Sequence, residues 1–231
     1  MARLSCKPTE LDNEKPKVRK QNHRQLQWVL DRIVSKDLKI RVQEFSDEEL
    51  VNAVSSIERL EEINWVHFEG RIPEVLKLAI PKIRQLIPHA TISIEFEKPD
   101  RQGLWELMAF ADVGFVSHTF FKRWQSEHPS LEPPLEYFYK ACRELNDRAS
   151  ILIALGADGA SFYDSRKGSG RVTTRRVDLV DATGAGDTFI AGIIWGVGKL
   201  KHSLKESTEL AVSLATRKVA QEGFDGVWES K

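Results

Sequence analysis

The stretch NWVHFEGRIPEVLKLAIPKIRQLIPHATISIEFE, residues 64–97, carries the pattern that decides the fold. Residues 64–69 are rich in aromatic and β-branched side chains, which is typical of a β-strand, and residues 91–97 predict a second strand. Between them, residues 72–87 predict a helix, with Pro81 expected to kink it. The stretch therefore predicts one strand–helix–strand unit.

The same alternation continues on both sides of this unit. Ser46 and Glu49 form a capping box that predicts a helix start. Further helices are expected over 103–111 and 135–145, from Ala185 to about Val197 and from Leu204 to about Gln221, and further strands over 113–117, 150–155, 160–164 and 171–177. Apolar strands alternating with amphipathic helices predict an α/β fold, a mostly parallel sheet with helices on both faces. Ligands of such sheets bind beyond the carboxyl ends of the strands.

Composition excludes several classes of protein. The 231 residues are 41% hydrophobic and 29% charged, and Lys plus Arg equals Asp plus Glu at 34 each. This balance gives no electrostatic reason to expect nucleic acid or a membrane surface as a partner. Cys6 and Cys142 lie too far apart for a disulfide framework or a metal-ligand spacing. The longest apolar run, residues 189–198, is half of the roughly 20 residues that a membrane span needs.

The beginning of the chain differs from the rest. Residues 1–20 are polar and charged, and we expect them to be disordered. The basic run at 15–24 is more typical of a solvated tail than of a nucleic-acid arm. Residues 21–36 predict a helix with one apolar face. No signal-peptide core is present in the first residues, so the expected location is cytoplasmic.

The loop VDATGAGDTF, residues 180–189, is the strongest candidate for chemistry. A helix N-terminus offers unpaired N–H groups and partial positive charge, and glycines let the backbone approach a phosphate closely. Asp187 would lie in the first turn, where it could accept a proton from an attacking hydroxyl during phosphoryl transfer. The alternative is that Asp181 caps the helix and the glycines only make the turn. The loop matches neither the P-loop nor the dinucleotide-binding pattern, which argues against an oxidoreductase.

VDATGAGDTFIAG, residues 180–192, closely resembles the C-terminal signature of the PfkB carbohydrate kinases, the ribokinase-like sugar kinases. Four blocks narrow the likeness to ketohexokinase- and fructokinase-like members: WVHFEGR (65–71), SIEFEKP (93–99), DVGFVS (112–117) and LATRKVAQEGFDG (214–226). The likeness runs from about residue 45 to 228. It implies a ribokinase-like, Rossmann-like fold that transfers the γ-phosphoryl group of ATP to a sugar hydroxyl. ATP and Mg²⁺ are the implied cofactors, and K⁺ is a further candidate.

The resemblance also implies roles for particular residues. Asp187 would be the catalytic base, and the amides of Gly184, Ala185 and Gly186 would form the anion hole. The residues implied for nucleotide binding are Gly156, Asp158 and Gly159 in a turn, Ala211, Val212 and Ala215 on a helix, and Arg71 at a strand end. A surface salt bridge is an equal alternative for Arg71. Glu95 and Glu97 alternate along a strand, and Glu97 is the one expected near the magnesium.

The resemblance is incomplete. The family has a Gly-Gly-x-x-x-Asn sugar-binding segment and a small lid sheet, whereas the first glycine here is Gly70. We therefore expect residues 1–44 to lie outside the likeness and residues 45–231 to form the C-terminal portion of an N-terminally truncated kinase domain. Ala182 stands where the family usually has Thr, and His118, to which no role is assigned, stands where ketohexokinases often have Lys.

Two expectations follow from the missing part. The first is a choice of function: an active kinase with a small-molecule sugar substrate, or a diverged non-catalytic protein that binds nucleotide or acts as an interaction module. The second concerns the sheet, which would expose an unpaired edge near 64–69 or 91–97. Such edges invite pairing between chains, so a homo-oligomer is expected.

Overall fold

The computed structural model describes residues 46–228, and it is built around a six-stranded sheet whose strands lie in chain order. The strands are β1 (Trp65–Phe68), β2 (Thr91–Phe96), β3 (Val113–Val116), β4 (Ser150–Ala154), β5 (Ala160–Asp164) and β6 (Gly168–Val172). β1 to β4 run parallel, and β5 and β6 are antiparallel to their neighbours. The predicted mostly parallel sheet is confirmed.

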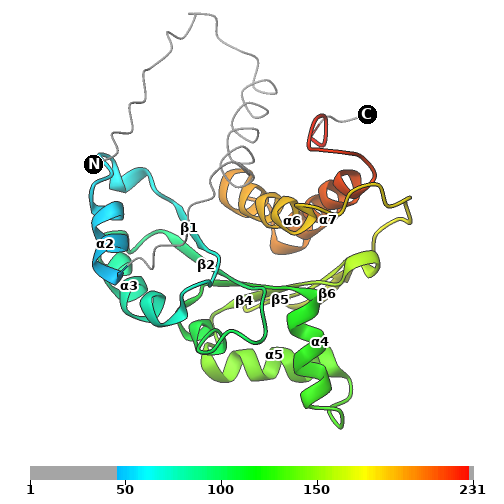
Figure 1. Cartoon of the computed structure of the whole chain (residues 1–231), viewed down its shortest axis with the longest axis horizontal. Helices are drawn as coiled ribbons and strands as arrows, with labels where there is room; N and C mark the ends of the chain where they lie inside the picture. Colours follow the sequence, from blue (N-terminus) through cyan, green and yellow to red (C-terminus); the bar gives the residue numbers. More distant parts are fainter. Residues whose placement is uncertain (1–45, 229–231) are drawn as a thin grey trace, which may run out of the picture.

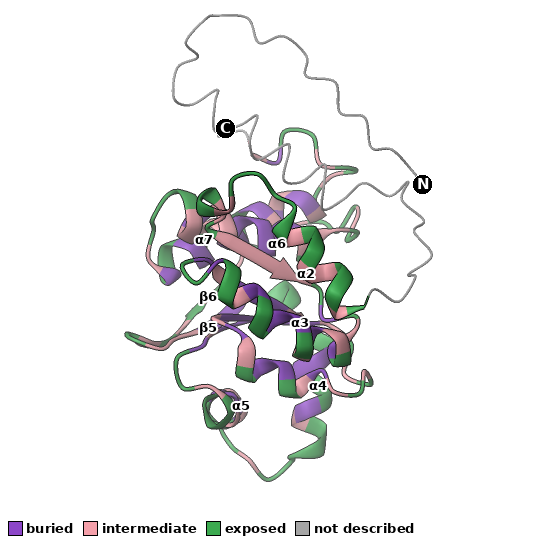
Figure 2. Cartoon of the chain, turned by 90° about the vertical axis from the view of Figure 1, so that its left-hand side faces the viewer, coloured by how far each residue is buried: buried purple, intermediate pink, exposed green. Residues whose placement is uncertain are grey.

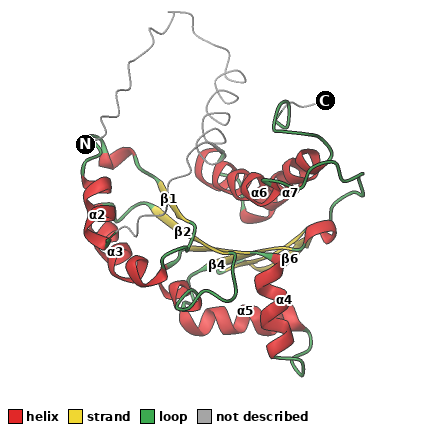
Figure 3. Cartoon of the chain, viewed as in Figure 1, coloured by secondary structure: helices red, strands yellow, loops and turns green. Residues whose placement is uncertain are grey.

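Helices cover both faces of the sheet, as Figures 1 and 3 show. The helices are α2 (Asp47–Ser55), α3 (Pro73–Leu86), α4 (His118–Glu127), α5 (Pro134–Leu145), α6 (Ala185–Ile193) and α7 (Leu204–Val219). α3, α4 and α5 connect successive parallel strands, and right-handed crossovers between adjacent strands place all such helices on one face. α6 and α7 follow the β5–β6 hairpin and cover the opposite face.

Alternating side chains on each strand feed two separate cores. On β4, Ile151 and Ile153 pack toward α3–α5, whereas Leu152 packs toward α6 and α7. Phe138 of α5 is fully buried in the first core and Ile193 of α6 in the second. Figure 2 shows the buried strands between helices whose outer surfaces are exposed. The period of two along each strand thus fixes which layer every apolar residue supports.

Several local predictions are confirmed. The capping box is formed, because Ser46 Oγ accepts a hydrogen bond from the Glu49 amide and Glu49 Oε2 accepts one from the Ser46 amide. α2 begins directly after it. The predicted helix is present as α3, with Pro81 inside it, and the kink at Pro81 stays a prediction. The predictions for residues 1–44, a tail and a helix at 21–36, lie outside the described residues.

Other local predictions are wrong in an instructive way. Residues 105–110 form a 3-10 helix rather than an α-helix, and α4 was not predicted. The segment predicted as strand 171–177 leaves the sheet after Val172, because the turn closes earlier than expected. Asp164 makes that turn by accepting hydrogen bonds from the amides of Arg166 and Lys167. After Ile193, α6 passes into a π-helix over Ile194–Lys199.

β1 and β6 are the two edge strands of the described sheet, and β2 lies inside it. All four β1 residues are half-buried. This confirms the first of the two expected edge positions and excludes the second; oligomerisation stays a prediction, which sedimentation velocity would test. Across residues 46–228, no helix has the length and apolar character required to cross a membrane.

Candidate functional site

A hollow of about 760 Å³ lies at the carboxyl ends of the central strands, between the sheet and helices α6 and α7. Its lining includes Glu95, Phe115, Ser117, His118, Gly156, Gly159, Gly186, Val212, Ala215 and Thr216. The ends of β2, β3 and β4 meet here because the three strands are parallel and end at one edge. The predicted ligand edge and the candidate loop therefore share one cavity.

The loop before α6 has a conformation that only glycine tolerates well. Gly184 is the N-cap of α6 with φ +75°, and a Cβ there would lie 2.5 Å from Cζ of Phe224. A Cβ on Gly186, by contrast, would meet nothing within 4 Å. Gly184 is thus required by backbone and packing, while the absence of a side chain at Gly186 keeps the wall of the hollow open.

Asp181 does not cap α6, so the simple turn-and-cap interpretation is wrong. The N-cap of α6 has no side-chain hydrogen bond. The Asp181 Oδ1 atom accepts from the Thr183 amide at 2.9 Å, and its Oδ2 atom accepts from Nζ of Lys218 at 2.5 Å. The Lys218 ammonium, helped by the Thr183 amide, holds the pKa of Asp181 well below its usual range.

Unpaired amides are concentrated at the start of α6. Within the described part of the chain, the amides of Gly184, Gly186 and Asp187 have no hydrogen-bond acceptor. The Ala185 amide differs from expectation, because it donates to the Ala182 carbonyl at 3.2 Å. Free N–H groups at a helix N-terminus, next to an open wall, form an arrangement that binds anions.

Asp187 lies in the first turn of α6, half-buried among other carboxylates. Burial raises its pKa above the usual range, and the nearby charges of Glu69 and Glu97 raise it further, while Arg71 opposes them. A carboxyl group in this environment is a better proton acceptor once ionised than a fully solvated one.

Glu95 is the carboxylate that faces the hollow from β2. Its neighbours Ile94 and Phe96 point into the core below the sheet, so Glu95 projects toward α6. Burial raises its pKa to about 7, with a further contribution from the charge of Asp187. Sequence reasoning preferred Glu97, which lies just past the strand, 3.5 Å from Nζ of Lys98. Strand alternation cannot separate the two, because residues two apart along a strand share a face. The difference is that β2 ends at Phe96, so only Glu95 is held by the strand.

Arg71 follows β1 and pairs with the carboxylate of Glu69. Its side chain is 58% exposed, so the surface salt bridge of the sequence analysis is present. The charge of Arg71 nevertheless lowers the pKa values of Asp187 and Glu95. Arg71 therefore forms a surface ion pair and also affects the protonation of the two carboxyl groups of the candidate site.

The candidate nucleotide residues divide into two groups. Gly156, Gly159, Val212 and Ala215 line the hollow. Two other candidates turn away from it. Ala211 is fully buried against Gly192, and the carboxylate of Asp158 is 76% exposed and points toward Arg171 at 3.9 Å.

The physical reason lies in helix geometry. Val212, Ala215, Thr216 and Val219 share one face of α7 because they are three or four residues apart, and this face lines the hollow. Ala211 is one position removed from Val212, so it turns toward α6 instead.

The structure adds residues that the sequence did not indicate. Arg175 and Arg176 line the hollow from the segment that had been predicted as a strand. His118, to which no role was assigned, also lines it as the first residue of α4, with Nδ1 3.8 Å from a Cβ built on Gly156. A chain that leaves the sheet after Val172 brings these arginines over the cavity, and no local sequence pattern encodes that path.

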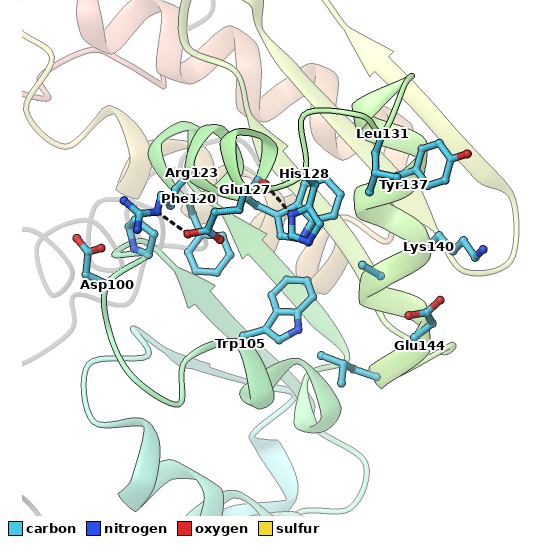
Figure 4. A pocket seen from close by; sticks show the side chains of 14 residues that line it. Asp100, Trp105, Phe120, Arg123, Glu127, His128, Leu131, Tyr137, Lys140 and Glu144 are labelled. Atoms are coloured by element: carbon cyan, nitrogen blue, oxygen red, sulfur yellow. Dashed lines mark hydrogen bonds and ion pairs between the residues drawn. The ribbon is translucent and has the colours of Figure 1, made fainter.

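A second hollow, of about 670 Å³, opens between α4, α5 and the 3-10 helix at 105–110, as Figure 4 shows. Some of its polar groups bond to one another: Arg123 pairs with Glu127 at 2.6 Å, and His128 Nδ1 lies 2.8 Å from the Trp124 carbonyl oxygen. It contains none of the candidate site residues. The hollow at the strand ends is therefore the functional candidate.

These features define a class of protein: an α/β fold with unpaired amides at a helix N-terminus and a carboxylate beside them, at the carboxyl edge of a parallel sheet. A family model described as pfkB family carbohydrate kinase matches residues 42–230. The chain belongs to this family.

Known relatives agree with that assignment. Ketohexokinase of Mus musculus is 28% identical over 182 residues, which cover 73% of this chain and 56% of the relative. Ribokinase of Giardia lamblia superposes with a TM-score of 0.63 at 16% identity, covering 79% of this chain and 60% of that one. Adenosine kinase of Schistosoma mansoni, solved with 2-fluoroadenosine, gives 0.62 at 16% identity, covering 79% and 57%. The two structures support the ribokinase-like fold, and this chain spans little more than half the length of each relative.

Proposed function

We propose that this protein transfers the γ-phosphoryl group of ATP to a sugar hydroxyl, in the manner of ketohexokinases and fructokinases. The observation that carries the proposal is the position of Asp187 in the first turn of α6, one residue after Gly186, which lines the hollow and has a free amide. Residues 45–231 would supply the nucleotide and catalytic portion of the kinase domain.

The chemistry assigned to these residues follows from charge. Asp187 accepts the proton of the sugar hydroxyl as that oxygen attacks phosphorus, and the leaving group is ADP. The amides of Gly184 and Gly186 stabilise the negative charge on the transferring phosphoryl oxygens. Gly156, Gly159, Val212 and Ala215 hold the nucleoside in the apolar part of the hollow, since a flat base needs a wall of small side chains.

The carboxylates of the site fit a magnesium ion that is held jointly with nucleotide phosphates. No group of three or more potential ligand side chains capable of holding a metal occurs between residues 46 and 228. Mg²⁺ in kinases uses one or two carboxylates plus phosphates and water, so Glu95 and Glu97 would suffice. Bound there, the ion would neutralise phosphate charge. A role for K⁺ stays a prediction.

Sugar-dependent ADP release is the direct test. The full chain, with ATP and magnesium, should release ADP in the presence of fructose, and ribose serves as the comparison sugar. The failure of every sugar to stimulate release, in a protein that binds ATP, would falsify the kinase proposal for this chain.

The second candidate function is nucleotide binding without transfer. It is favoured by one observation: the hollow is lined by Gly156, Gly159, Val212 and Ala215, which this proposal assigns to the nucleotide, while the given sequence contains no Gly-Gly-x-x-x-Asn segment to assign to a sugar. ATP binding by calorimetry, combined with the turnover assay, separates the two candidates.

A further inference from the structure

The geometry points to Lys218 as a positioning residue that holds the phosphoryl-binding loop, residues 182–187, in its active conformation through Asp181 and Phe224. This inference rests on the proposed function. Lys218 lies in the last turn of α7 and contributes nothing to the lining of the hollow. Its effect on the reaction would therefore be indirect.

The ammonium group of Lys218 is buried, and its burial costs free energy. The Lys218 side chain is 0% exposed, whereas the Asp181 side chain is 29% exposed. Burying an ammonium group costs free energy unless it is paired and hydrogen-bonded, and apolar residues often replace buried ion pairs without loss of stability. Packing alone therefore does not explain why a lysine occupies this position.

The ammonium group of Lys218 forms both of its hydrogen bonds with Asp181, the residue that precedes the loop. Nζ of Lys218 donates to Oδ2 of Asp181 at 2.5 Å and to the Asp181 carbonyl at 3.1 Å. The adjacent Val219 carbonyl accepts from the amides of Val180 and Asp181. The end of α7 therefore fixes both the backbone and the side chain of the residue that enters the loop.

The same ammonium group also contacts Phe224, whose ring packs on Gly184 within the loop. Lys218 Nζ lies 5.0 Å from the centroid of the Phe224 ring, over its face. A Cβ on Gly184 would lie 2.5 Å from Cζ of that ring, so Phe224 closes directly on the N-cap of α6. Cation–π attraction orients the ring. One buried charge thus braces both the start of the loop and the glycine that begins α6.

Lys218→Met tests the inference, because it keeps most of the side-chain volume and removes the charge. We expect kcat to fall about 10- to 100-fold, since small displacements of groups around the reacting atoms have effects of this size. KM for ATP should stay within about twofold of wild type, because the lining of the hollow is untouched. Lys218→Arg should restore part of kcat.

Amide hydrogen exchange supplies a readout that does not depend on activity. In Lys218→Met, the hydrogen-bonded amides within residues 182–188, those of Thr183, Ala185 and Thr188, should exchange faster, while those of β3 and β4 keep wild-type protection. Asp181→Asn, which leaves Lys218 in place, should produce the same local change. Lys205→Met is the matched control, an exposed lysine on the same helix with its Nζ 3.9 Å from Glu209, and it should change neither readout.

The outcomes are distinguishable. Unchanged kcat and unchanged exchange in Lys218→Met would overturn the inference, and so would faster exchange throughout the chain, which indicates a role in stability alone. If the wild-type protein shows no turnover, the proposed function fails, and local exchange at residues 182–188 alone decides whether Lys218 braces the loop.

Discussion

The two faces of the sheet use the same strands for different purposes. Toward α3–α5, β2 presents Ile92, Ile94 and Phe96, all fully buried in a large apolar core. Toward α6 and α7, the same strand presents Ser93, which is buried, and Glu95, which faces the hollow. One face therefore maintains the fold and the other carries the candidate chemistry, and substitutions on each should separate stability from activity.

β1 extends this contrast. On the α6 face, Nε1 of Trp65 donates to Oγ of Ser93 at 2.8 Å, and Nδ1 of His67 lies 2.9 Å from the same oxygen. Burial lowers the pKa of His67 to about 4, so the ring is neutral at physiological pH. The polar groups of Trp65, His67 and Ser93 thus bond to one another on this face, and on the opposite face the buried hydroxyl of Tyr139 donates to Oγ of Ser161 at 2.7 Å.

The largest expected effect is on activity, from a substitution on the side of the sheet covered by α6 and α7. Asp187→Ala should lower turnover by at least about 10²–10⁴, because a positioned base contributes that much. Nucleotide affinity should remain nearly unchanged, since the substitution leaves the lining from Gly156 to Val212 intact. ADP-release kinetics and calorimetry with ATP measure the two quantities. A variant that retains turnover would refute the assignment of the base.

The largest effect on the apolar face is expected at Phe138, which packs against Trp105, Phe121 and Trp124 and is fully buried. Phe138→Ala should lower the free energy of unfolding by about 3–5 kcal/mol through lost burial and a new cavity. Urea unfolding measures this change.

The neighbouring residue provides the control for that experiment. Tyr137 is 38% exposed, and Tyr137→Ala should change stability by only about 0.5 kcal/mol. Equal losses at the two positions would show that the aromatic cluster does not maintain this layer.

A smaller effect is expected from Glu95 as the pH changes. Its pKa is raised from 4.5 to about 7, so between these values the folded protein binds more protons than the unfolded chain. The free energy of unfolding should therefore fall as pH rises through this window. Glu95→Gln should remove that fall and stabilise the protein at pH 8 by about 1–2 kcal/mol, after allowance for solvent screening.

Thermal or urea unfolding at pH 5 and pH 8 measures the difference. Stability curves that run parallel in wild type and Glu95→Gln would contradict the burial of this charge. A steeper fall of the free energy of unfolding with pH in the variant than in wild type would show that folding lowers the pKa of Glu95 instead of raising it.

Much of this architecture was available from the sequence. The strand–helix–strand unit at 64–97, the glycines of the loop and Asp187 were all identified, because periodicity and glycine spacing are local properties. The structure places that unit in the sheet and puts Gly186 at the wall of the hollow. The roles assigned to these residues stay predictions until activity is measured.

The sequence could not supply the direction in which these side chains point or the contacts between residues far apart in the chain. It could not tell that Glu95 rather than Glu97 lines the hollow, that Ala211 faces Gly192, or that Arg175 reaches the cavity. These facts depend on where a strand ends, on which face of a helix meets its neighbour and on the path of the chain after β6, and only the tertiary structure determines them.

The bond between Lys218 and Asp181 joins residues 37 positions apart. The sequence by itself determined the alternation of elements, the family likeness and the loop, because each depends on residues close together in the chain. The tertiary structure alone decided which groups surround that loop, because burial and hydrogen bonding act across the fold.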